Sequence, residues 1–412
     1  MIASRQLDLA ASPGALISAL AGQVSDLCAL RLGGRVVLCF GATAEVQVAP
    51  GWQDAVRALL RPDPAPQGVA FAGGCVGFLG YEAGRFCERM PDPREGASLG
   101  DGVFRRYPGG LQRLADGWVL VGEPGWVSQA QAVIQALDLQ TPTAPLPPEL
   151  VHAPPDAEYA AGVREILERI AAGDHYQVNL SRRLELAPTE RPERLLAALL
   201  AAHPLAPHGA FLQVPGGALI SDSPELFWRL ESGRVHTRPI KGTAPLGCEA
   251  ALESDPKERA ELTMIVDLMR NDLGRVCTPG SVQVSPRRIF ALPTLLHAEQ
   301  QVEGRLAPGR DALDLMDASF PPASITGAPK VQAMATIHAL ESTPRGAYTG
   351  AIGAFLDGGD AEFSVAIRVL QALDHTTLLH VGCGIVADSD PASEVRETWL
   401  KARSWLGERP GG

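Results

Sequence analysis

Residues 361–406 read AEFSVAIRVLQALDHTTLLHVGCGIVADSDPASEVRETWLKARSWL, and the arrangement of this stretch decides the fold class. The runs AEFSVAIRVLQAL (361–373) and TLLHVGCGIVAD (377–388) have the composition of strands, with a short polar turn between them. Asp390 followed by Pro391 is a typical helix start, and the helical pattern continues to about Leu406. This part of the chain therefore predicts neighbouring strands followed by one helix.

The rest of the chain has the same grouping of strands and helices. Glycine-punctuated runs such as RVVLCFG (35–41) and GWVLVG (117–122) predict antiparallel strands in the first 140 residues. Because strands and helices are grouped and do not alternate strictly, we expect an α+β fold with antiparallel sheets. Apolar residues at helical spacing predict three further helices, from an Asp156 cap to Gly173, from Pro192 to Ala202 and from Lys257 to about Val276.

A proline-rich segment divides the sequence. The stretch TPTAPLPPELVHAPPD (141–156) contains six prolines and is typical of an extended surface connector. We expect a β-rich N-terminal part at 1–140, a connector at 141–155 and a catalytic domain at 156–412.

Charge and cysteine usage restrict the classes of partner. The chain of 412 residues has 36 basic and 47 acidic side chains, a net charge of −11, which argues against a nucleic acid or a membrane surface as the main partner. Its seven cysteines include no C-x-x-C pair, so a disulfide framework or zinc knuckle is not expected. Asp8 and Pro13 interrupt the apolar N-terminal stretch, and we expect a soluble, cytoplasmic protein.

The last predicted helix has acidic residues on one stripe. Glu394, Glu397 and Lys401 follow each other at spacings of three and four residues. Two carboxylates one turn apart can share a hard cation such as Mg²⁺. In isolation, a solvated charged face with a helical salt bridge explains the same pattern. Glu261, at the start of the apolar run of the helix at 257–276, is a further candidate, with an amphipathic surface helix as the alternative.

Lys241 lies in the segment TRPIKGTAP, directly after a strand-like run. The adjacent Gly242 allows another group to approach the backbone closely. A lysine nucleophile must be neutral, and burial lowers the pKa of a lysine enough to populate the free amine. A surface lysine in a turn is the alternative.

Other segments supply further polar candidates. Gly382 and Gly384 leave backbone amides accessible to a carboxylate, or mark a β-bulge. Glu225 precedes a bulky apolar pair, where desolvation would make it a general acid. The cationic candidates for an anionic substrate are Lys330 and Arg368, and His297 fits either a site or the core.

Taken in order, these segments resemble the chorismate-utilising enzymes, which include component I of anthranilate synthase and of aminodeoxychorismate synthase, and the isochorismate and salicylate synthases. GFLGYEAGR (77–85) also resembles the N-terminal half of that family. The resemblance implies antiparallel sheets that form a sandwich with helices packed outside. The matching stretches are YQVNLSRR (176–183), SPELF (223–227), RPIKGT (238–243), ERAELTMIVDLMRNDLGRV (258–276), PPASITGAPK (321–330), AIR (366–368) and GCGIVADSDPASEVRETWLKA (382–402).

The resemblance also implies roles for the matching positions. It makes Glu261, Glu394 and Glu397 the ligands of Mg²⁺, which would bind the ring carboxylate of chorismate. It gives Glu225 the protonation of the departing 4-hydroxyl, and it makes His297 an active-site residue. The implied substrate-binding residues are Gln177, Thr243, Thr326, Arg368, Gly382, Gly384 and Lys401.

Two positions distinguish the members of this family. Isochorismate and salicylate synthases have a water-activating lysine where this chain has Gln177. Anthranilate synthases usually have alanine where this chain has Lys241, and lysine there is typical of aminodeoxychorismate synthases. The resemblance thus implies amination of chorismate to 4-amino-4-deoxychorismate through a covalent lysine adduct, on the path to p-aminobenzoate and folate.

Two rival readings remain. The nearer one is component I of anthranilate synthase, which makes anthranilate and pyruvate. The other is a non-catalytic chorismate-binding regulator, which the joint presence of the acidic residues and Lys241 disfavours. The sequence has no apparent glutaminase nucleophile elbow, so we expect ammonia from a separate glutamine amidotransferase subunit or from solution.

Overall fold

Two large antiparallel sheets and one small sheet form the framework in the computed structural model, which describes residues 2–139, 147–202, 206–291 and 295–407. The first sheet contains, in spatial order, β1 (Ala3–Leu7), β8 (Gly117–Gly122), β7 (Gly109–Leu114), β3 (Arg35–Cys39), β2 (Cys28–Leu32), β11 (Ala210–Val214), β12 (Gly217–Ser221), β23 (Val369–Leu373), β24 (Thr377–Ile385), β10 (Gln177–Leu186) and β20 (Gly327–Ala328), and β9 (Leu150–His152) pairs with β10.

The second sheet and the small third sheet are formed mostly by later segments. The second contains β16 (Gln283–Val284), β19 (Val302–Arg305), β14 (Arg234–Thr237), β13 (Leu226–Glu231), β22 (Ala361–Val365), β21 (Ala351–Leu356), β5 (Gly74–Leu79), β6 (Gly102–Tyr107) and β4 (Ala44–Gln47). The third contains β15 (Ile240–Pro245), β18 (Leu295–Glu299) and β17 (Arg288–Ala291).

The two large sheets pack face to face. In β3, Val37 and Cys39 belong to a core that also contains Phe78 of β5, whereas Leu38 points to the opposite face of the sheet. Successive side chains of a strand point to opposite faces, so a strand buried on both faces needs a continuous apolar run. This explains the run RVVLC, and the predicted α+β sandwich of antiparallel sheets is confirmed.

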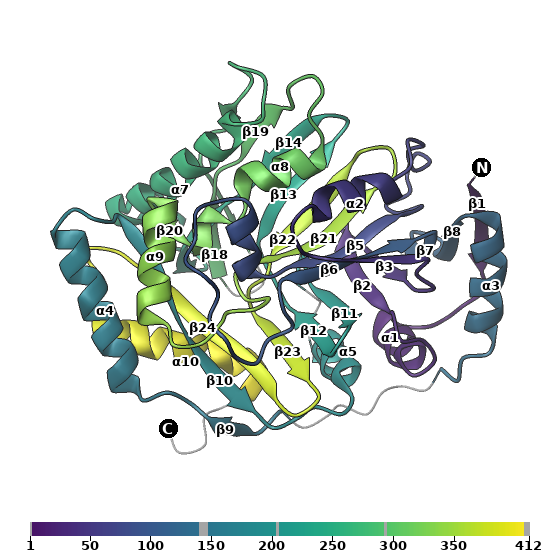
Figure 1. Ribbon diagram of the computed structural model, residues 1–412, viewed down its shortest axis with the longest axis horizontal. Coiled ribbons are helices and arrows are strands. Elements are labelled where there is room, and N and C mark those ends of the chain that lie inside the picture. The colour runs from purple at the N-terminus through teal and green to yellow at the C-terminus, as the bar shows by residue number, and fades with distance from the viewer. Residues whose placement is uncertain (1, 140–146, 203–205, 292–294, 408–412) are drawn as a thin grey trace.

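Helices cover the outer faces of this sandwich (Figure 1). The first sheet packs against α1 (Pro13–Ala21), α3 (Pro124–Gln135), α5 (Pro192–Ala202) and α10 (Pro391–Leu406). The second packs against α2 (Trp52–Leu59), α7 (Pro256–Gly274) and α8 (Ala312–Ser319). Beyond β10 and β24 lie α4 (Asp156–Ala171) and α9 (Lys330–Leu340). The shorter helical segments are α6 (Glu249–Ser254), η1 (Tyr81–Phe86) and η2 (Ala323–Ile325).

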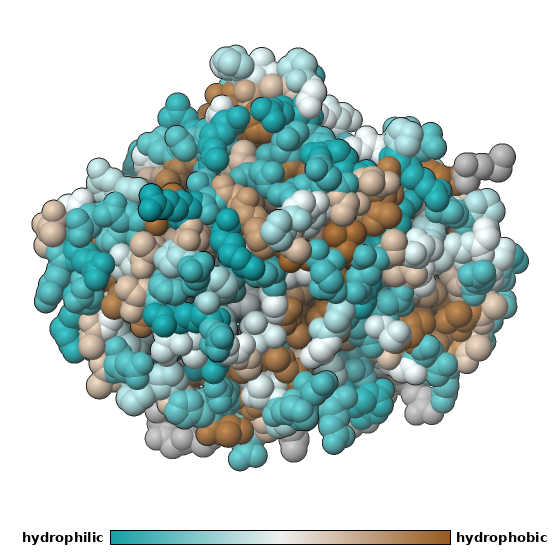
Figure 2. Space-filling model, viewed as in Figure 1, coloured by the Kyte–Doolittle hydropathy of each residue, from teal (hydrophilic) through white to brown (hydrophobic). Residues whose placement is uncertain are grey.

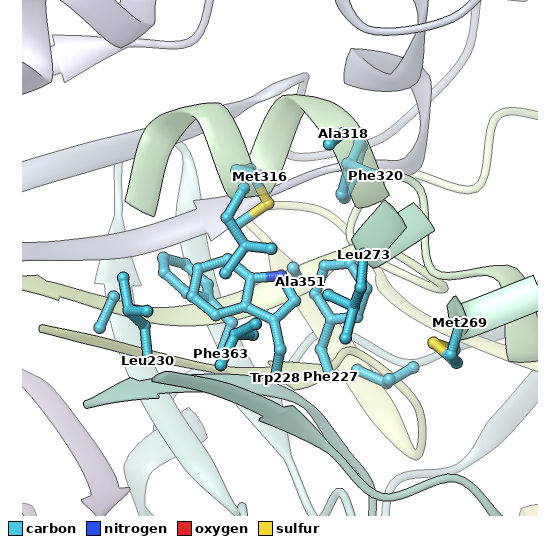
Figure 3. Packing of buried hydrophobic residues seen from close by; sticks show 14 of the residues in the cluster. Phe227, Trp228, Leu230, Met269, Leu273, Met316, Ala318, Phe320, Ala351 and Phe363 are labelled. Carbon is cyan, nitrogen blue, oxygen red and sulfur yellow. The ribbon is translucent and has the colours of Figure 1, made fainter. Parts of the chain in front are cut away.

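An aromatic cluster lies between the second sheet and α8. Trp228 of β13 packs on Phe363 of β22 with ring centroids 5.0 Å apart, and Met316 of α8 lies over them (Figure 3). The adjacent Phe227 is also buried in this cluster. This packing fixes the start of β13, and therefore the position of the residue before it, Glu225.

Both large sheets combine strands from the two ends of the sequence. In the first sheet Leu30 of β2 pairs with Ala210 of β11, and in the second Cys75 of β5 pairs with Phe355 of β21. Strands before and after the segment at 141–155 therefore belong to the same sheets. Residues 140–146 lie outside the described part of the chain, and β9 follows them.

The four predicted helices are present as α4, α5, α7 and α10. The Asp390 side chain caps α10 by accepting a hydrogen bond from the Ser393 amide, as predicted. At α4 the cap residue is Pro155, and Asp156 is the first helical residue.

Several helices were not predicted, among them α1, α3, α8 and α9. In α1 the residues Gly14, Ala15, Leu16 and Ile17 are consecutive and all buried, so the apolar residues do not follow a one-sided helical pattern. No helix among the residues described here meets the length and apolarity needed to span a membrane. On the face shown in Figure 2, hydrophobic residues are scattered among hydrophilic ones.

Candidate active site

Glu225 lies just before β13 and is held at both its backbone and its side chain. Its carbonyl accepts a hydrogen bond from the Val365 amide at 3.1 Å. The Ser324 hydroxyl donates a hydrogen bond of 2.7 Å to Glu225 Oε1. Burial raises the pKa of Glu225, and the Ser324 hydrogen bond and the positive charges of Lys241 and His208 lower it in part. A carboxyl group in this setting keeps its proton to higher pH than an exposed one, as a general acid requires.

Lys241 and His297 lie on neighbouring strands of the small third sheet. Lys241 of β15 pairs with Ala298 of β18, and the next register pair is Thr243 with His297. His297 contacts the Phe290 ring, with ring centroids 5.9 Å apart. The structure does not describe the side chain of Thr243. Lys241 is half-buried, and α7 packs against both its strand β15 and η2, which contains Ser324, the hydrogen-bond partner of Glu225.

Gln177 is the first residue of β10 and pairs with Ala328 of β20. Its side chain is 1% exposed, and its Nε2 donates to the Ser324 carbonyl at 3.5 Å. A Cβ atom added at Gly384 would lie 3.2 Å from the side-chain amide nitrogen of Gln177, so β24 closely approaches this side chain of β10. Gln177 therefore connects the segment that holds Glu225 with the glycine pair of β24.

Gly382 and Gly384 flank Cys383 on β24, opposite Ser181 and Asn179 of β10. A Cβ atom at Gly382 would lie 2.4 Å from the Leu180 carbonyl oxygen, so only glycine allows this approach of the two strands. The Gly382 carbonyl accepts a hydrogen bond of 2.9 Å from Lys401 Nζ. Lys401 therefore lies beside the glycine pair of β24.

Helix α10 brings its two predicted acidic ligands together. Ligand atoms of Glu394, Glu397 and Cys383 all lie within 4.8 Å of one another. Lys401 Nζ lies 2.8 Å from Glu397 Oε1 and also forms the hydrogen bond to Gly382. Burial lowers the pKa of Lys401, but the negative groups around it, Glu397 included, raise it overall. These two carboxylates fit Mg²⁺, which takes one or two protein carboxylates, whereas the thiol of Cys383 is not a ligand type that Mg²⁺ prefers.

The third predicted ligand, Glu261, lies on a different helix from Glu394 and Glu397. Glu261 is a half-buried residue of α7 and is not part of the group of Glu394, Glu397 and Cys383 among the described residues. Its helix packs against β15 and η2, the elements that contain Lys241 and Ser324. The structure therefore places Glu261 on a helix adjoining the site but does not join it to the other two acids.

Arg368 lies between β22 and β23 with its side chain exposed. Its φ of 49° is in the left-handed region, which is uncommon for a residue other than glycine. Its carbonyl accepts a hydrogen bond of 3.0 Å from the Asp222 amide, three residues before Glu225. This contact holds Arg368 at the edge of the site.

Thr326 is fully buried, and its hydroxyl donates to the Pro322 carbonyl at 2.8 Å. Its own carbonyl accepts a hydrogen bond of 2.9 Å from the Asn179 amide of β10. These contacts fix the segment 321–330 against β10.

Two features of the site were not predicted. Ser324 lies inside a motif that was noted, but nothing in a single sequence shows that its hydroxyl meets a carboxylate 99 residues away. Lys330 was a cationic candidate for an anionic substrate, but its ammonium group pairs with the buried Asp272 of α7 at 2.8 Å. A basic residue at the end of a loop gives no indication of which acid on another helix it meets.

A family model described as chorismate binding enzyme matches residues 35–407. Among the curated relatives, anthranilate synthase component 1 of Streptomyces coelicolor is 38% identical over 385 residues, which cover 83% of this chain and 74% of the relative. Aminodeoxychorismate synthase component 1 of Salmonella typhimurium is 38% identical over 361 residues, which cover 84% of this chain and 79% of the relative.

Solved structures agree with the fold. Anthranilate synthase component I from Streptococcus pneumoniae superposes with a TM-score of 0.79 at 26% identity, covering 90% of this chain and 91% of that one. The menaquinone-specific isochorismate synthase MenF from Escherichia coli has a TM-score of 0.76 at 20% identity, covering 98% of this chain and 94% of that one, and supports the fold alone. The family match extends over all the segments that form the candidate site, and the chain belongs to the chorismate-binding enzymes.

Proposed function

We propose that this protein catalyses the Mg²⁺-dependent amination of chorismate by ammonia to 4-amino-4-deoxychorismate, through a covalent adduct with Lys241. The observation that carries the proposal is that α7 packs against both β15, which contains Lys241, and η2, whose Ser324 donates a hydrogen bond to the buried Glu225. An amine nucleophile and a carboxylic acid in one site are the two groups that displacement of a ring hydroxyl needs. The relatives named aminodeoxychorismate synthase component 1 support this choice.

In the first step the neutral amine of Lys241 forms a bond to ring carbon 2. Both ring double bonds shift, the bond from carbon 4 to its hydroxyl oxygen breaks, and Glu225 gives its proton to that oxygen so that water leaves. Burial raises the pKa of Glu225 and keeps the proton available for this transfer. The products of the step are a secondary ammonium group on Lys241 and an ionised Glu225.

In the second step ammonia forms a bond to carbon 4. Both double bonds shift back, the bond between carbon 2 and the lysine nitrogen breaks, and Lys241 leaves as a neutral amine. The Glu225 carboxylate takes the proton from the new ammonium group, which restores both side chains. The sum is chorismate plus ammonia giving 4-amino-4-deoxychorismate plus water.

The residue at 177 disfavours water as the nucleophile. Gln177 is buried, and its amide nitrogen is hydrogen-bonded to the Ser324 carbonyl. An amide is not a base and does not activate water at neutral pH. Hydration of the ring is thus disfavoured relative to attack by an amine.

Glu394 and Glu397 would hold Mg²⁺, with Glu261 as the further candidate ligand. When bound, the ion would neutralise a carboxylate of the substrate and fix its orientation. The Gly382 and Gly384 amides and Lys401 are the candidates for contacts to the same carboxylate. Thr243, Thr326, Arg368 and His297 complete the proposed substrate-binding and active-site residues.

We further propose that a glutamine amidotransferase subunit delivers the ammonia. The relatives are named component 1, which supports a second component. Folate biosynthesis and a cytoplasmic location follow from this proposal.

Component I of anthranilate synthase remains the second candidate. Its support is the relative of Streptomyces coelicolor, which is as similar to this chain as those with the other name. The candidates differ in product, because anthranilate formation also releases pyruvate.

The deciding experiment supplies the purified protein with chorismate, Mg²⁺ and ammonium. We expect a product that a separate lyase converts to p-aminobenzoate, with pyruvate released only after the lyase is added. Anthranilate fluorescence together with immediate pyruvate release would contradict the proposal and identify the protein as component I of anthranilate synthase. Unchanged chorismate under these conditions would contradict both.

A further inference from the structure

We propose that Ser324 is a positioning residue, which fixes the Glu225 carboxyl group by a hydrogen bond to Oε1 and so directs the other oxygen toward the leaving hydroxyl. The inference rests on the proposed function only in that Glu225 acts as the acid. Ser324 lies on η2 and Glu225 before β13, so the contact joins two segments that are distant in sequence.

The hydrogen bond between Ser324 and Glu225 is buried and short. Ser324 is 3% exposed and Glu225 is 9% exposed, so water competes little for either group. The donor–acceptor distance of 2.7 Å is short, as expected when a hydroxyl donates to a carboxylate. A hydroxyl that donates to one carboxylate oxygen fixes the plane of the carboxyl group and leaves the second oxygen for another partner.

The backbone around Ser324 is held independently of its side chain. The Ile325 and Thr326 amides donate to the carbonyls of Pro322 and Ala323, which closes the turn of η2. The Ser324 carbonyl accepts from Gln177 Nε2. Removing the hydroxyl alone therefore leaves the turn in place and isolates the contact with Glu225.

The groups around Glu225 predict in which direction the loss of the Ser324 hydroxyl shifts the pKa of Glu225. Lys241 on β15 and His208 before β11 carry the positive charges that lower the pKa of Glu225, and the Ser324 hydrogen bond adds to them. A hydrogen bond to the ionised form favours that form, so its loss raises the pKa further. Ser324→Ala should therefore keep Glu225 protonated to higher pH while leaving it poorly aimed.

The test compares wild type with Ser324→Ala, Ser324→Thr and the control Ser364→Ala. Ser364 is also a buried serine, and its hydroxyl donates to the Ile352 carbonyl in the sheet core. For Ser324→Ala we expect kcat to fall by about tenfold, KM for chorismate to stay within about threefold, and the alkaline limb of the pH profile to move up by about one pH unit. Ser324→Thr should restore the limb, and Ser364→Ala should leave it in place.

A second readout requires no turnover. Infrared difference titration follows the protonated carboxyl band that is lost in Glu225→Gln, and Ser324→Ala should shift its midpoint to higher pH. If kcat falls without a shift of either the pH limb or this midpoint, Ser324 has only a structural role and the proposal is wrong. Failure of the proposed function appears separately, as a different product or no product from wild type, while the infrared midpoint still tests Ser324.

Discussion

The ammonium group of Lys330 and the carboxylate of Asp272 form a buried ion pair with a nitrogen–oxygen distance of 2.8 Å. Lys330 Nζ also donates to the Ser319 carbonyl at 2.9 Å. Asp272 lies near the C-terminal end of α7 and Lys330 is the first residue of α9. This pair therefore joins the helix that contains Glu261 to the segment that contains Ser324.

Lys330→Met should destabilise the protein by about 3–5 kcal/mol at neutral pH, because it leaves a buried carboxylate without its partner. Burial raises the pKa of Asp272 to about 6 even with Lys330 present. A carboxyl group whose folded-state pKa is raised favours the folded state most at low pH, and this contribution is lost as the pH rises through that pKa. The deficit of the variant should thus shrink below pH 6, as measured by denaturant unfolding at several pH values.

Arg270→Met is the matched control, since Arg270 pairs with Asp267 on the exposed face of the same helix. Its loss should cost less than about 1 kcal/mol at any of these pH values. A Lys330→Met variant as stable as this control would contradict the structural role assigned to the buried pair.

Lys241→Ala should abolish the covalent adduct with chorismate and reduce 4-amino-4-deoxychorismate formation by about a hundredfold or more, because no other amine replaces the nucleophile. Intact-protein mass spectrometry after mixing with chorismate detects the adduct. Lys241→Arg keeps the positive charge without a nucleophilic amine, and it should behave as the alanine variant does. An adduct that persists on either variant would assign the nucleophile to another residue.

Glu397→Gln should raise the Mg²⁺ concentration needed for half-maximal activity by about tenfold or more, because one of two adjacent carboxylates is lost. Isothermal titration with Mg²⁺ alone gives the same comparison without substrate. Glu165→Gln is the matched control: Glu165 forms an i,i+4 salt bridge with Arg169 on α4, as Glu397 does with Lys401 on α10.

Glu261→Gln decides whether the third acid belongs to the metal site. If Glu261 is a ligand, its loss should raise the Mg²⁺ concentration needed for half-maximal activity as much as the loss of Glu397 does. A titration identical to wild type would limit the metal ligands to α10.

His380 predicts acid sensitivity of the fold. It is buried on β24 with its ring stacked on Tyr348, and burial together with the nearby Arg183 and Arg345 lowers its pKa from 6.5 to about 3. The group stabilises the folded state above pH 6.5, and this contribution is lost as the pH falls toward 3. We expect protonation of His380 to lower the free energy of unfolding by about 1.4 kcal/mol for each pH unit below 6.5.

Denaturant unfolding between pH 7.5 and 5 measures this slope, which should be shallower for His380→Gln. The exposed His152 serves as the control, and His152→Gln should leave the slope unchanged. Equal slopes for wild type and His380→Gln would show that His380 does not control the acid response.

Local patterns predicted much of the fold because their causes are local. The Asp390 cap, the helical spacing of α4 and the two-sided apolar run of β3 each depend on neighbouring residues. Helix α8 was missed because most of its residues are buried, and α9 because its apolar residues include the exposed Val331 and so do not form a single stripe.

The site could be predicted residue by residue but not as a set of contacts. Lys241 and Glu225 were named from their segments, yet their proximity depends on how the small third sheet packs beside β13. Ser324 and Lys330 also depend on partners on distant segments. Ser324 donates a hydrogen bond to Glu225, and Lys330 pairs with Asp272. Such pairings are decided by tertiary packing, which spacing along one sequence does not contain.

The pairing of β5 with β21 determines when this protein can fold during its synthesis. β5 begins at residue 74 and β21 at residue 351, so one edge of β5 stays open until most of the chain has left the ribosome. At about 5–20 residues per second this interval is on the order of tens of seconds. Throughout it, the nascent N-terminal strands expose an unpaired apolar edge, which makes the emerging chain a candidate substrate for molecular chaperones.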